Sequence, residues 1–440
     1  MTTTTSGAVP IGDGQPPAPV SSVQTSRRVV WASFVGTALE SYDFYVFAYF
    51  AAFFVGPLFF EPFGVVGGTL AAFLSIAAAF VIRPVGAIVF GQLGDRLGRR
   101  TTLLITIALM GVATGLIGVL PTYATAGWIA PILLVTLRLV QGLSLGGEWG
   151  GAILLATEHA EPRRRGFVAA IPQLGSPVGS ILSATLFIVM TLLVSSEDMV
   201  AWGWRIPFLT AIPLLLVSLY LRWSIEETPV FKGLDAAGIK PRYPLLAVLK
   251  AQPLALVVAV GAALLGIGSY SLMNTYTVNY GVAELGFSFQ DLLVATTIGG
   301  LLQLVTIPLF GVWATRIGSA KVVAVGAIGT LLVAFPMYYL LQFATFPILV
   351  GTMIIGGILP TLAWAALGGL MHDLFEARFS YSALSFAYSI AATLTAFVPA
   401  LTLIIGESTG FVWWHPGVVL AALSLLTFVA AVAAVRLRRP

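Results

Sequence analysis

The segment FGQLGDRLG at residues 90–98 recurs in the second half of the chain as FGVWATRIG at residues 310–318. The two segments align without gaps, and identical or similar residues occupy the Phe, Gly, Arg, aliphatic and Gly columns. They are offset by 220 residues, which is half of the 440-residue chain. Because self-similarity at a fixed spacing is the signature of a repeated architecture, the pair predicts two related halves.

The composition around these segments is typical of a membrane protein. Hydrophobic residues make up 58% of the chain and charged residues only 9%, whereas a soluble domain carries about 25% charged residues. Because this small number of charges cannot cover the molecule with polar surface, we expect an integral membrane protein. The net charge of +4 comes without a single basic patch and does not indicate nucleic-acid binding. The absence of Cys excludes disulfides and thiol chemistry.

Twelve apolar runs are long enough to cross a bilayer, which takes about 20 residues in a helix. Six lie on each side of a polar segment at residues 224–249. The expected spans are 30–57, 67–91, 102–120, 128–156, 167–194, 206–223, 252–282, 291–314, 321–341, 347–370, 381–405 and 416–435.

The positions of Lys and Arg support this count. Of the 22 Lys and Arg residues, 19 fall in segments that the spans place on one side, and Arg222 is counted among them. The six connectors on the other side contain none, and the remaining three are Arg83, Arg138 and Arg205. Because basic loops stay in the cytoplasm, both termini are expected to be cytoplasmic, as an even number of spans requires.

The fold class that follows is an all-α membrane protein with two six-helix bundles. The N-terminal segment is rich in Thr, Gly, Pro and Ser and has no apolar core, so it reads as a disordered tail rather than a signal peptide. The expected parts are a cytoplasmic tail at 1–28, an N-terminal bundle at 29–223, a cytoplasmic linker at 224–250, a C-terminal bundle at 251–436 and a basic tail at 437–440.

Several motifs resemble one transporter family. GQLGDRLGRR (91–100) matches the loop signature of the major facilitator superfamily, and RLVQG (138–142) resembles its fourth-span motif. The wider set resembles the metabolite:H⁺ symporter family, densely over 28–232 and weakly over 250–440. This set also contains GTALESYDFYVF (36–47), LRLVQGLSLGGEWGGA (137–152), EHAEPRRRGF (158–167) and WGWRIPF (202–208).

The resemblance implies two like bundles around a pseudo-two-fold axis along the membrane normal. It also implies transport of a small metabolite such as shikimate, α-ketoglutarate, citrate, proline or betaine. Two features of the second half depart from the family pattern. Thr315 stands where an acid is expected, and the stretch before the eleventh span is altered to HDLFEARFSYS (372–382). The resemblance therefore does not fix the substrate and does not extend to a symmetric second gate.

Three charged residues lie deep inside expected spans. Glu40 and Asp43 are about 11 and 14 residues into the first span and, at spacing i, i+3, share a helix face. Arg138 is about ten residues into the fourth span, so all three lie near mid-depth at a rise of about 1.5 Å per residue. A charge at the bilayer centre costs about 2.5–3.5 kcal/mol on insertion scales. We therefore expect these side chains to point into a cavity between the bundles.

The expected role of this group is to bind substrate and protons. The three His residues, at 159, 372 and 415, lie at span ends, so a proton carrier has to be a carboxylate. Burial raises the pKa of a carboxylic acid and a nearby arginine lowers it. A substrate carboxylate that takes over the arginine would release the acid to bind H⁺. The alternative is a static ion pair that fixes packing, with Glu40 as a structural partner of an arginine.

Three further residues of these spans are candidates. Arg83 precedes Pro84, which bends a helix, so it is either a second substrate-facing cation or a cap for freed carbonyls. Gln141 lies one turn from Arg138 and is expected to orient it. Glu148 is nearer the cytoplasm, and a role in gating or proton exit competes with a structural salt bridge.

The loop at 91–100 is expected to form a cytoplasmic latch. Gly91, Gly94 and Gly98 permit close backbone approach, and Asp95 can accept hydrogen bonds from a helix N-terminus. Ion pairs of the loop arginines with Glu158 would hold the outward-open state. The alternative is that the arginines only anchor the orientation of the chain. The gating arginines are Arg96, Arg99 and Arg100.

The second half is expected to contribute neutral groups to the cavity. Tyr270 and Asn274 lie on one face of the seventh span and Tyr276 and Tyr280 on another, where packed aromatics are the alternative. The G-x-S-x-G match at 142–146 lies in mid-span, so small residues for close helix packing explain it better than a nucleophile elbow.

The function expected is uptake of a small carboxylate-bearing metabolite, driven by proton symport and alternating access. The substrate would be a shikimate-like or other organic acid; a zwitterion such as betaine or proline, and proton-antiporting efflux, are the alternatives. The sequence contains neither G-x-x-x-x-G-K-[ST] nor H-E-x-x-H, so no ATP-driven pump, enzyme, metal or cofactor is expected. The expected partners are substrate, protons and the lipid bilayer, for a monomer in the inner (plasma) membrane.

Overall fold

The computed structural model describes residues 23–238 and 242–437. Most of the expected tail at 1–28, the residue Lys240 and most of the basic tail at 437–440 lie outside the described residues. The described part of the chain is helical and contains no β-strand. The first helix already begins at Val23, six residues before the expected start of the N-terminal bundle.

Long helices account for most of the fold. They are α1 (Val23–Phe50), α3 (Gly64–Leu97), α4 (Arg99–Ile117), α6 (Ile129–Glu158), α8 (Gly175–Leu193), α11 (Ala211–Trp223), α14 (Pro253–Ser271), α16 (Phe289–Ile317), α17 (Ser319–Leu341), α18 (Phe346–Leu374), α19 (Ser380–Ala396) and α21 (His415–Leu437). Shorter helices extend or connect them: α2 (Gly56–Phe59), α5 (Tyr123–Ala126), α7 (Arg165–Ala170), α9 (Ser196–Ala201), α10 (Ile206–Leu209), α12 (Pro229–Ala236), α13 (Pro244–Ala251), α15 (Thr277–Ala283) and α20 (Val398–Thr409).

The number of membrane spans agrees with the sequence. Among the described residues, eleven helical segments are long and apolar enough to cross a bilayer, and one bent pair brings the total to twelve. The bent pair is Arg28–Phe50 with Phe53–Phe59, which meet at 50°. The bend coincides with a π-helical turn at Ala51–Val55, a common cause of a sharp kink.

Several spans are longer than their apolar runs. The second was expected to end at residue 91, but α3 continues through the charged residues to Leu97. The fifth was expected to begin at residue 167, and its helical segment begins at Pro162. Backbone hydrogen bonding continues where the helix leaves the hydrocarbon, so a hydropathy run underestimates the helix.

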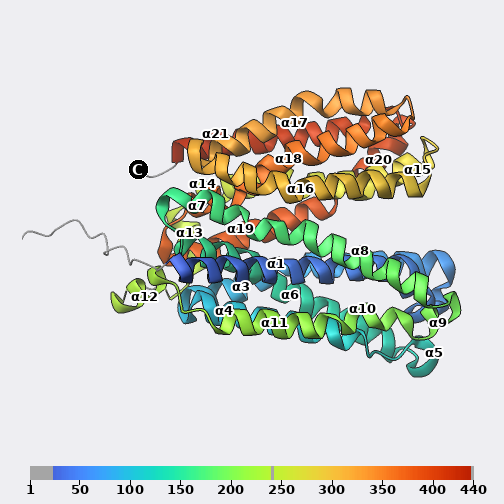
Figure 1. Ribbon diagram of the computed structural model, residues 1–440, viewed down its shortest axis with the longest axis horizontal. Coiled ribbons are helices and arrows are strands. Elements are labelled where there is room, and N and C mark those ends of the chain that lie inside the picture. Colours follow the sequence, from blue (N-terminus) through green and yellow to red (C-terminus); the bar gives the residue numbers. More distant parts are fainter. Residues whose placement is uncertain (1–22, 239–241, 438–440) are drawn as a thin grey trace, which may run out of the picture.

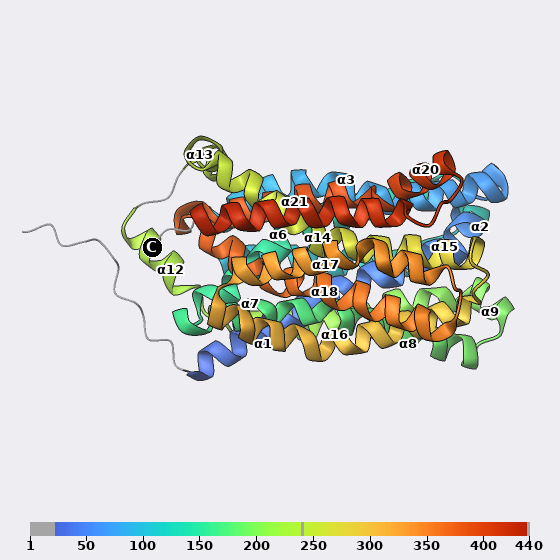
Figure 2. The same cartoon turned by 90° about the horizontal axis from the view of Figure 1, so that it is seen from above.

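The helices form two bundles that lie side by side (Figure 1). The helices α14, α16, α17, α18 and α21 occupy one layer, and α1, α3, α4, α6 and α11 the other. Two main sets of helix contacts join the bundles: α19 packs on α3 and α6, and α7 and α8 pack on α16, with α18 also contacting α7 and α6. The helices α12 and α13, the start of α1 and the end of α21 all lie at one end of the molecule, here called the linker end (Figure 2).

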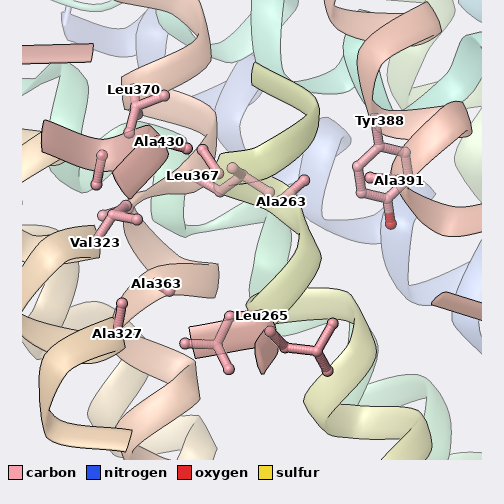
Figure 3. Packing of buried hydrophobic residues seen from close by; sticks show 14 of the residues in the cluster. Ala263, Leu265, Val323, Ala327, Ala363, Leu367, Leu370, Tyr388, Ala391 and Ala430 are labelled. Carbon is pink, nitrogen blue, oxygen red and sulfur yellow. The ribbon is translucent and has the colours of Figure 1, made fainter. Parts of the chain in front are cut away.

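A hydrophobic core fills the second bundle (Figure 3). Small and branched residues such as Ala263, Val323, Ala363 and Leu367 interdigitate where α14, α17, α18 and α21 meet. Side chains of α6, among them Ile153, belong to the same buried cluster. The bundles therefore share apolar packing around α6 as well as having cores of their own.

Glycine allows the close packing of α3 against α6. A Cβ atom on Gly142 would collide with the carbonyl oxygen of Ala79, and one on Gly146 would collide with that of Arg83. The prediction that the small residues at 142–151 serve close helix packing is confirmed for this pair.

The segment at 224–250 contains two short helices that the sequence analysis did not predict. The side chain of Thr228 caps α12 by accepting a hydrogen bond from the Phe231 backbone N–H at 3.2 Å. A Thr-Pro start followed by apolar residues is a helix signal that the polar average of the segment concealed. The use of this segment as a boundary between two domains remains a prediction.

Candidate functional site

A cavity of about 150 Å³ lies between the two bundles. The first half lines it through α1, α3, α6 and α8, and the second half through α14, α16, α18, α19 and the π-helical turn Leu272–Tyr276. Its polar and charged lining comprises Thr37, Glu40, Ser41, Arg83, Ser176, Ser269, Ser271, Asn274, Gln303 and Thr361. Its aromatic lining comprises Phe44, Tyr45, Phe80, Trp149, Tyr270, Trp364 and Tyr388.

Glu40 and Arg83 are the charged residues that line this cavity. The guanidinium of Arg83 lies over the Phe80 ring, with Cζ 4.5 Å from the ring centroid. Arg83 Nε and Glu40 Oε2 are buried without hydrogen-bond partners, and no ion pair joins the two side chains among the described residues. A guanidinium with an unpaired N–H donor and a carboxylate with an unpaired oxygen thus belong to the lining of the same cavity. Such a site can bind a carboxylate through the guanidinium and a cation or proton at the acid.

Asp43 belongs to a buried network of α1, α4 and α6. Its Oδ1 accepts hydrogen bonds from Thr114 Oγ1 at 2.5 Å and from Gln141 Nε2 at 2.7 Å. Arg138 Nη1 donates to Gln141 Oε1 at 2.7 Å and lies 3.9 Å from Asp43 Oδ2. The Arg138 guanidinium also stacks on Phe47, with Cζ 3.7 Å from the ring centroid. Gln141 therefore bridges the acid and the arginine.

The prediction that all three deep charges face the cavity is wrong for two of them. Glu40 lines the cavity, whereas Asp43 and Arg138 do not and are 1% and 2% exposed. Residues at i and i+3 differ by about 60° around a helix axis, enough to place one at the cavity and the other against α4 and α6. The network lies directly behind the cavity wall, one turn of α1 beyond Glu40.

The neutral candidates of the second half also separate. Tyr270 and Asn274 line the cavity as expected, and the Tyr270 ring meets Tyr45 across the bundle interface at 5.9 Å. Tyr276 does not line it, which contradicts its choice as a cavity residue. Its hydroxyl is hydrogen-bonded to His415 inside the second bundle, so packing determines its position.

A second set of contacts joins the bundles at the linker end. Asp95 Oδ1 accepts a hydrogen bond from the Tyr381 backbone N–H at 3.2 Å, and Oδ2 accepts one from the Ser382 N–H at 2.9 Å. These N–H groups belong to the first turn of α19, where the helix dipole favours an anion. The predicted placement of Asp95 at a helix N-terminus is therefore confirmed.

Arg99 extends these contacts into a buried cluster. Its Nε lies 3.5 Å from Glu158 Oε2, and its Nη1 lies 3.6 Å from Asp95 Oδ1. Its Nη2 donates to the Ala377 carbonyl oxygen of the second half at 2.8 Å. We call Asp95, Arg99, Glu158 and the residues they contact at 377–382 the linker-end latch.

Glycine brings the two backbones of the latch together. A Cβ atom on Gly91 would lie 2.9 Å from Ser382 Cα, and one on Gly94 would collide with the Tyr381 ring. Larger residues at these positions would push α3 away from α19. The latch is closed in this structure.

Two other expectations about the latch need correction. Arg100 was expected to pair with Glu158, but its Nη2 donates to the Trp223 carbonyl oxygen at 2.7 Å, and the ion pair of Glu158 is formed by Arg99. Arg96 was also expected to act in the latch, but its side chain is exposed in the last turn of α3, whereas the Asp95–Arg99–Glu158 cluster is buried.

The partner that sequence reasoning missed is Glu227. Its carboxylate accepts hydrogen bonds from the backbone N–H groups of Arg99 and Arg100 at 3.0 and 3.1 Å. It therefore caps α4, which has no capping side chain of its own. Gly98 has a φ of +112° and a Cβ there would collide with Glu227. The uncapped helix start after Gly98 was the available signal.

The repeat partner of the latch lies at the α7–α16 contact. Thr315 Oγ1 accepts a hydrogen bond from the Phe167 backbone N–H at 2.8 Å and donates to the Gly311 carbonyl oxygen at 3.0 Å. A close approach therefore exists here without the acid. Beside it is a cavity of about 350 Å³ whose lining includes Arg165, Thr315, Arg316, Ser319 and Asp373.

Glu148 and Arg222 form another buried pair. Glu148 of α6 is 0% exposed and lies 3.7 Å from Arg222 Nη2 of α11. Arg222 was counted with the basic residues of the cytoplasmic segments, but its side chain is 1% exposed inside the bundle. A charge at the end of an apolar run resembles a topology anchor, so its burial could not be predicted from the sequence.

Comparisons with known proteins agree with this architecture. The family model described as "Sugar (and other) transporter" matches residues 29–235. The inner membrane metabolite transport protein YhjE of Escherichia coli (strain K12) is 35% identical over 415 residues, covering 93% of this chain and 94% of the relative. The shikimate transporter of the same organism is 34% identical over 376 residues, covering 85% and 86%.

A solved structure shows the same fold. The proton:xylose symporter XylE of the major facilitator superfamily, bound to 6-bromo-6-deoxy-D-glucose, superposes with a TM-score of 0.77 at 16% sequence identity. The match covers 94% of this chain and 96% of that structure.

The chain belongs to the major facilitator superfamily, in the group of metabolite transporters that contains these relatives. It is a multi-pass inner-membrane protein and a secondary transporter of small substrates, and it is not an enzyme.

Proposed function

We propose that the protein imports a small carboxylate-bearing metabolite together with protons. The observation that carries this proposal is the cavity between the bundles, whose lining includes an arginine and a glutamate that each have a buried polar atom without a hydrogen-bond partner. A further acid, Asp43, lies one turn behind, held by a glutamine and an arginine. The relative named as a shikimate transporter supports a hydroxylated organic acid as substrate.

The proposed binding step uses Arg83 rather than Arg138. A substrate carboxylate can satisfy the Arg83 guanidinium, while its hydroxyls bond to neutral groups such as Asn274 and Gln303. Neutralising the arginine removes the charge that favours the ionised form of Glu40, so the acid takes up a proton. Asp43 and Arg138 make a second acid–arginine pair through which the proton state of the bundle responds.

The proposed cycle moves one bundle against the other around this cavity. We propose that the linker end and both termini face the cytoplasm, as the basic residues indicate, and that 29–223 and 251–436 move as units joined by 224–250. The closed latch then corresponds to a state whose cytoplasmic side is shut. Breaking it would open the cavity to the cytoplasm.

A zwitterion is the second candidate substrate. Trp149 and Tyr388 stack face to face at 4.1 Å, and the Trp364 ring lies 6.3 Å from Tyr388. Aromatic faces beside a carboxylate suit a quaternary or secondary ammonium group. A betaine-like molecule would place its cation here and its carboxylate at Arg83.

Uptake by purified protein in lipid vesicles tests the proposal. With an inward proton gradient, labelled organic acids and zwitterions are offered in turn. The proposal predicts that at least one carboxylate-bearing compound accumulates above equilibrium and that a protonophore abolishes the accumulation. Accumulation driven only by an outward proton gradient would indicate antiport and contradict it, as would uptake that ignores the protonophore.

A further inference from the structure

The Glu148–Arg222 pair lies in the first bundle apart from both the cavity lining and the latch. Its closest charged atoms are 3.7 Å apart, which exceeds a hydrogen bond. All three guanidinium nitrogens of Arg222 and both carboxylate oxygens of Glu148 are buried without hydrogen-bond partners among the described residues. A fully buried pair is stable only when such groups are satisfied. The two side chains of this pair do not supply each other with these hydrogen bonds.

Further unsatisfied hydroxyls lie on helices that carry or contact the pair. The buried oxygens of Ser33 on α1, Ser218 on α11, and Tyr381 and Ser385 on α19 also lack partners. Buried polar groups of this kind normally bind water molecules, each of which makes about three hydrogen bonds. When three helices contribute several such groups to one region, the groups can bind water molecules that are connected by hydrogen bonds.

The order of residues along the helices places the pair between cavity and latch. On α6, Glu148 lies about 10 Å along the axis from Gln141 and about 15 Å from Glu158, at about 1.5 Å per residue. On α1, a Cβ on Gly36 would collide with the Arg222 guanidinium, and Glu40 of the cavity follows one turn later. The pair is therefore one helical turn from the cavity acid.

The second bundle completes the route along α19. Tyr388 lines the cavity, and Ser385 approaches α6 so closely that a Cβ on Gly150 would lie 2.5 Å from its Oγ. Tyr381 follows one turn nearer the linker end, and its backbone N–H is bonded to Asp95 of the latch. Polar groups thus continue from the cavity acid to the latch.

We propose that Glu148 is a second protonation site and that Arg222 positions and stabilises its carboxylate. The proton released by the carboxyl group of Glu40 passes through bound water to the carboxylate of Glu148 and leaves along the hydroxyls towards the linker end. No covalent bond other than O–H forms or breaks. The inference rests on the proposed proton symport and adds the path by which the proton leaves.

Other charged groups define the electrostatics of this site. Besides Arg222 of α11, Glu148 experiences Glu40 and Asp43 of α1 and Arg83 of α3. Tyr381 of α19 lies in the field of both members of the pair. A proton that moves from Glu40 to Glu148 therefore keeps the number of charges in the bundle constant. The competing role, a static pair that fixes α6 to α11, predicts no such exchange.

Two transport assays on Glu148→Gln separate these roles. In exchange, labelled substrate swaps for unlabelled substrate at equal pH and needs no proton release, so we expect a rate within about twofold of wild type. Accumulation under a proton gradient needs release in each cycle, and we expect it to fall by at least about tenfold. Glu148→Asp should recover most of it. The matched control Glu161→Gln changes an exposed acid of the same end and should alter neither assay.

The outcomes distinguish this inference from the proposed function. If the wild type shows no proton-driven accumulation, both are overturned. If the wild type accumulates substrate and Glu148→Gln does too, only the second protonation site is overturned. Parallel loss of exchange and accumulation in a folded variant would overturn it as well, because it indicates a structural pair.

Infrared difference spectroscopy provides a readout that a structural pair would not change. As the pH is lowered, the wild type should show a band from the protonated carboxyl group of Glu148 in addition to that of Glu40, and this band should be absent in Glu148→Gln. The band remaining in full in Glu148→Gln would contradict the assignment. Arg222→Lys, which keeps the charge, should shift the band without removing it.

Discussion

The two halves of the molecule repeat a fold but differ in where they bury charge. The spans of the first half bury six charged side chains away from the latch, whereas among the described residues the spans of the second half bury no Lys, Arg, Asp or Glu. Buried charges are costly inside a membrane unless they are paired. Because all six lie in one bundle, the ion pairs Asp43–Arg138 and Glu148–Arg222 are contained within it, and in the proposed cycle they would persist while the neutral bundle moves. The six are Glu40, Asp43, Arg83, Arg138, Glu148 and Arg222.

The two contacts between the bundles differ in the same way. Asp95 accepts hydrogen bonds from two backbone N–H groups, those of Tyr381 and Ser382. Its repeat partner Thr315 accepts one, from Phe167. Hydrogen bonds to an ionised acceptor are roughly twice as strong as neutral ones. The first contact is therefore the stronger hold on the closed state.

The same repeat explains the cavity beside the weaker contact. Ser319 stands 220 residues after Arg99 and occupies its place in the repeat. The Arg99 side chain is fully buried and fills the space of the latch, whereas the small Ser319 lines a cavity of about 350 Å³. A charged cluster in one half thus corresponds to open space in the other.

The largest expected effect concerns the cavity arginine and its neutral counterpart. Arg83→Gln should reduce uptake about 100-fold, mainly through KM, because losing charge-assisted hydrogen bonds worth about 3 kcal/mol weakens carboxylate binding. Gln303→Ala, on the opposite wall, should reduce it about fivefold. Initial rates over a range of substrate concentrations measure both. Equal losses of uptake in Arg83→Gln and Gln303→Ala would contradict the distinction between a charged first half and a neutral second half.

The latch comes next in size. Asp95→Asn should shift the equilibrium towards the open linker end by about 30-fold, for a loss of about 2 kcal/mol, and Thr315→Val by about fivefold. Because the chain has no Cys, a single Ser385→Cys placed behind the latch reports opening through its labelling rate with a maleimide. A larger shift for Thr315→Val than for Asp95→Asn would show that the Thr315 contact is the stronger of the two.

Whether these features could be predicted from the sequence depends on whether they follow from local patterns or from contacts between distant segments. Span number, the glycine packing of α3 on α6 and the Asp95 contact depend on local patterns, and the structure agrees with them. The spacing of Glu40 and Asp43 fixes their angular separation, but which of the two faces the cavity depends on how α1 is rotated against its neighbours. No single-helix pattern contains that rotation.

Contacts between residues far apart in the sequence could not be predicted either. Arg222 pairs with Glu148, 74 residues earlier, and Glu227 caps a helix that begins at Arg99. Each looked like an ordinary charge near a span end, because hydropathy describes a residue's neighbours in sequence and not those in space. The difference between the two contacts was visible in the sequence as the replacement of an acid by Thr315 and as the altered stretch at 372–382.

Two glycines provide a comparison of stability between the halves. A Cβ on Gly146 would collide with α3, whereas Gly300 of α16 has nothing within 4 Å of that position. Gly146→Ala should destabilise the protein by about 1–3 kcal/mol through overpacking, and Gly300→Ala should change stability by no more than about 1 kcal/mol. Thermal unfolding in detergent measures the difference. Equal melting temperatures would indicate that α3 and α6 separate easily.

The smallest effect is expected from making the two contacts alike. Thr315→Asp restores the acid of the first contact and should slow opening of the linker end by about threefold, through a charge-assisted bond to the Phe167 N–H. The maleimide rate of Ser385→Cys measures it. Faster labelling would show that the hydroxyl, and not an acid, suits this contact.

The most direct test of the central claim is proton movement itself. Purified protein is placed in vesicles that enclose a pH-sensitive dye, the membrane potential is clamped, and substrate is added outside at equal pH. The account predicts that the interior acidifies as substrate enters and that Glu40→Gln, which removes the proposed proton carrier of the cavity, abolishes the acidification. Entry of substrate into wild-type vesicles with no change in internal pH would contradict it.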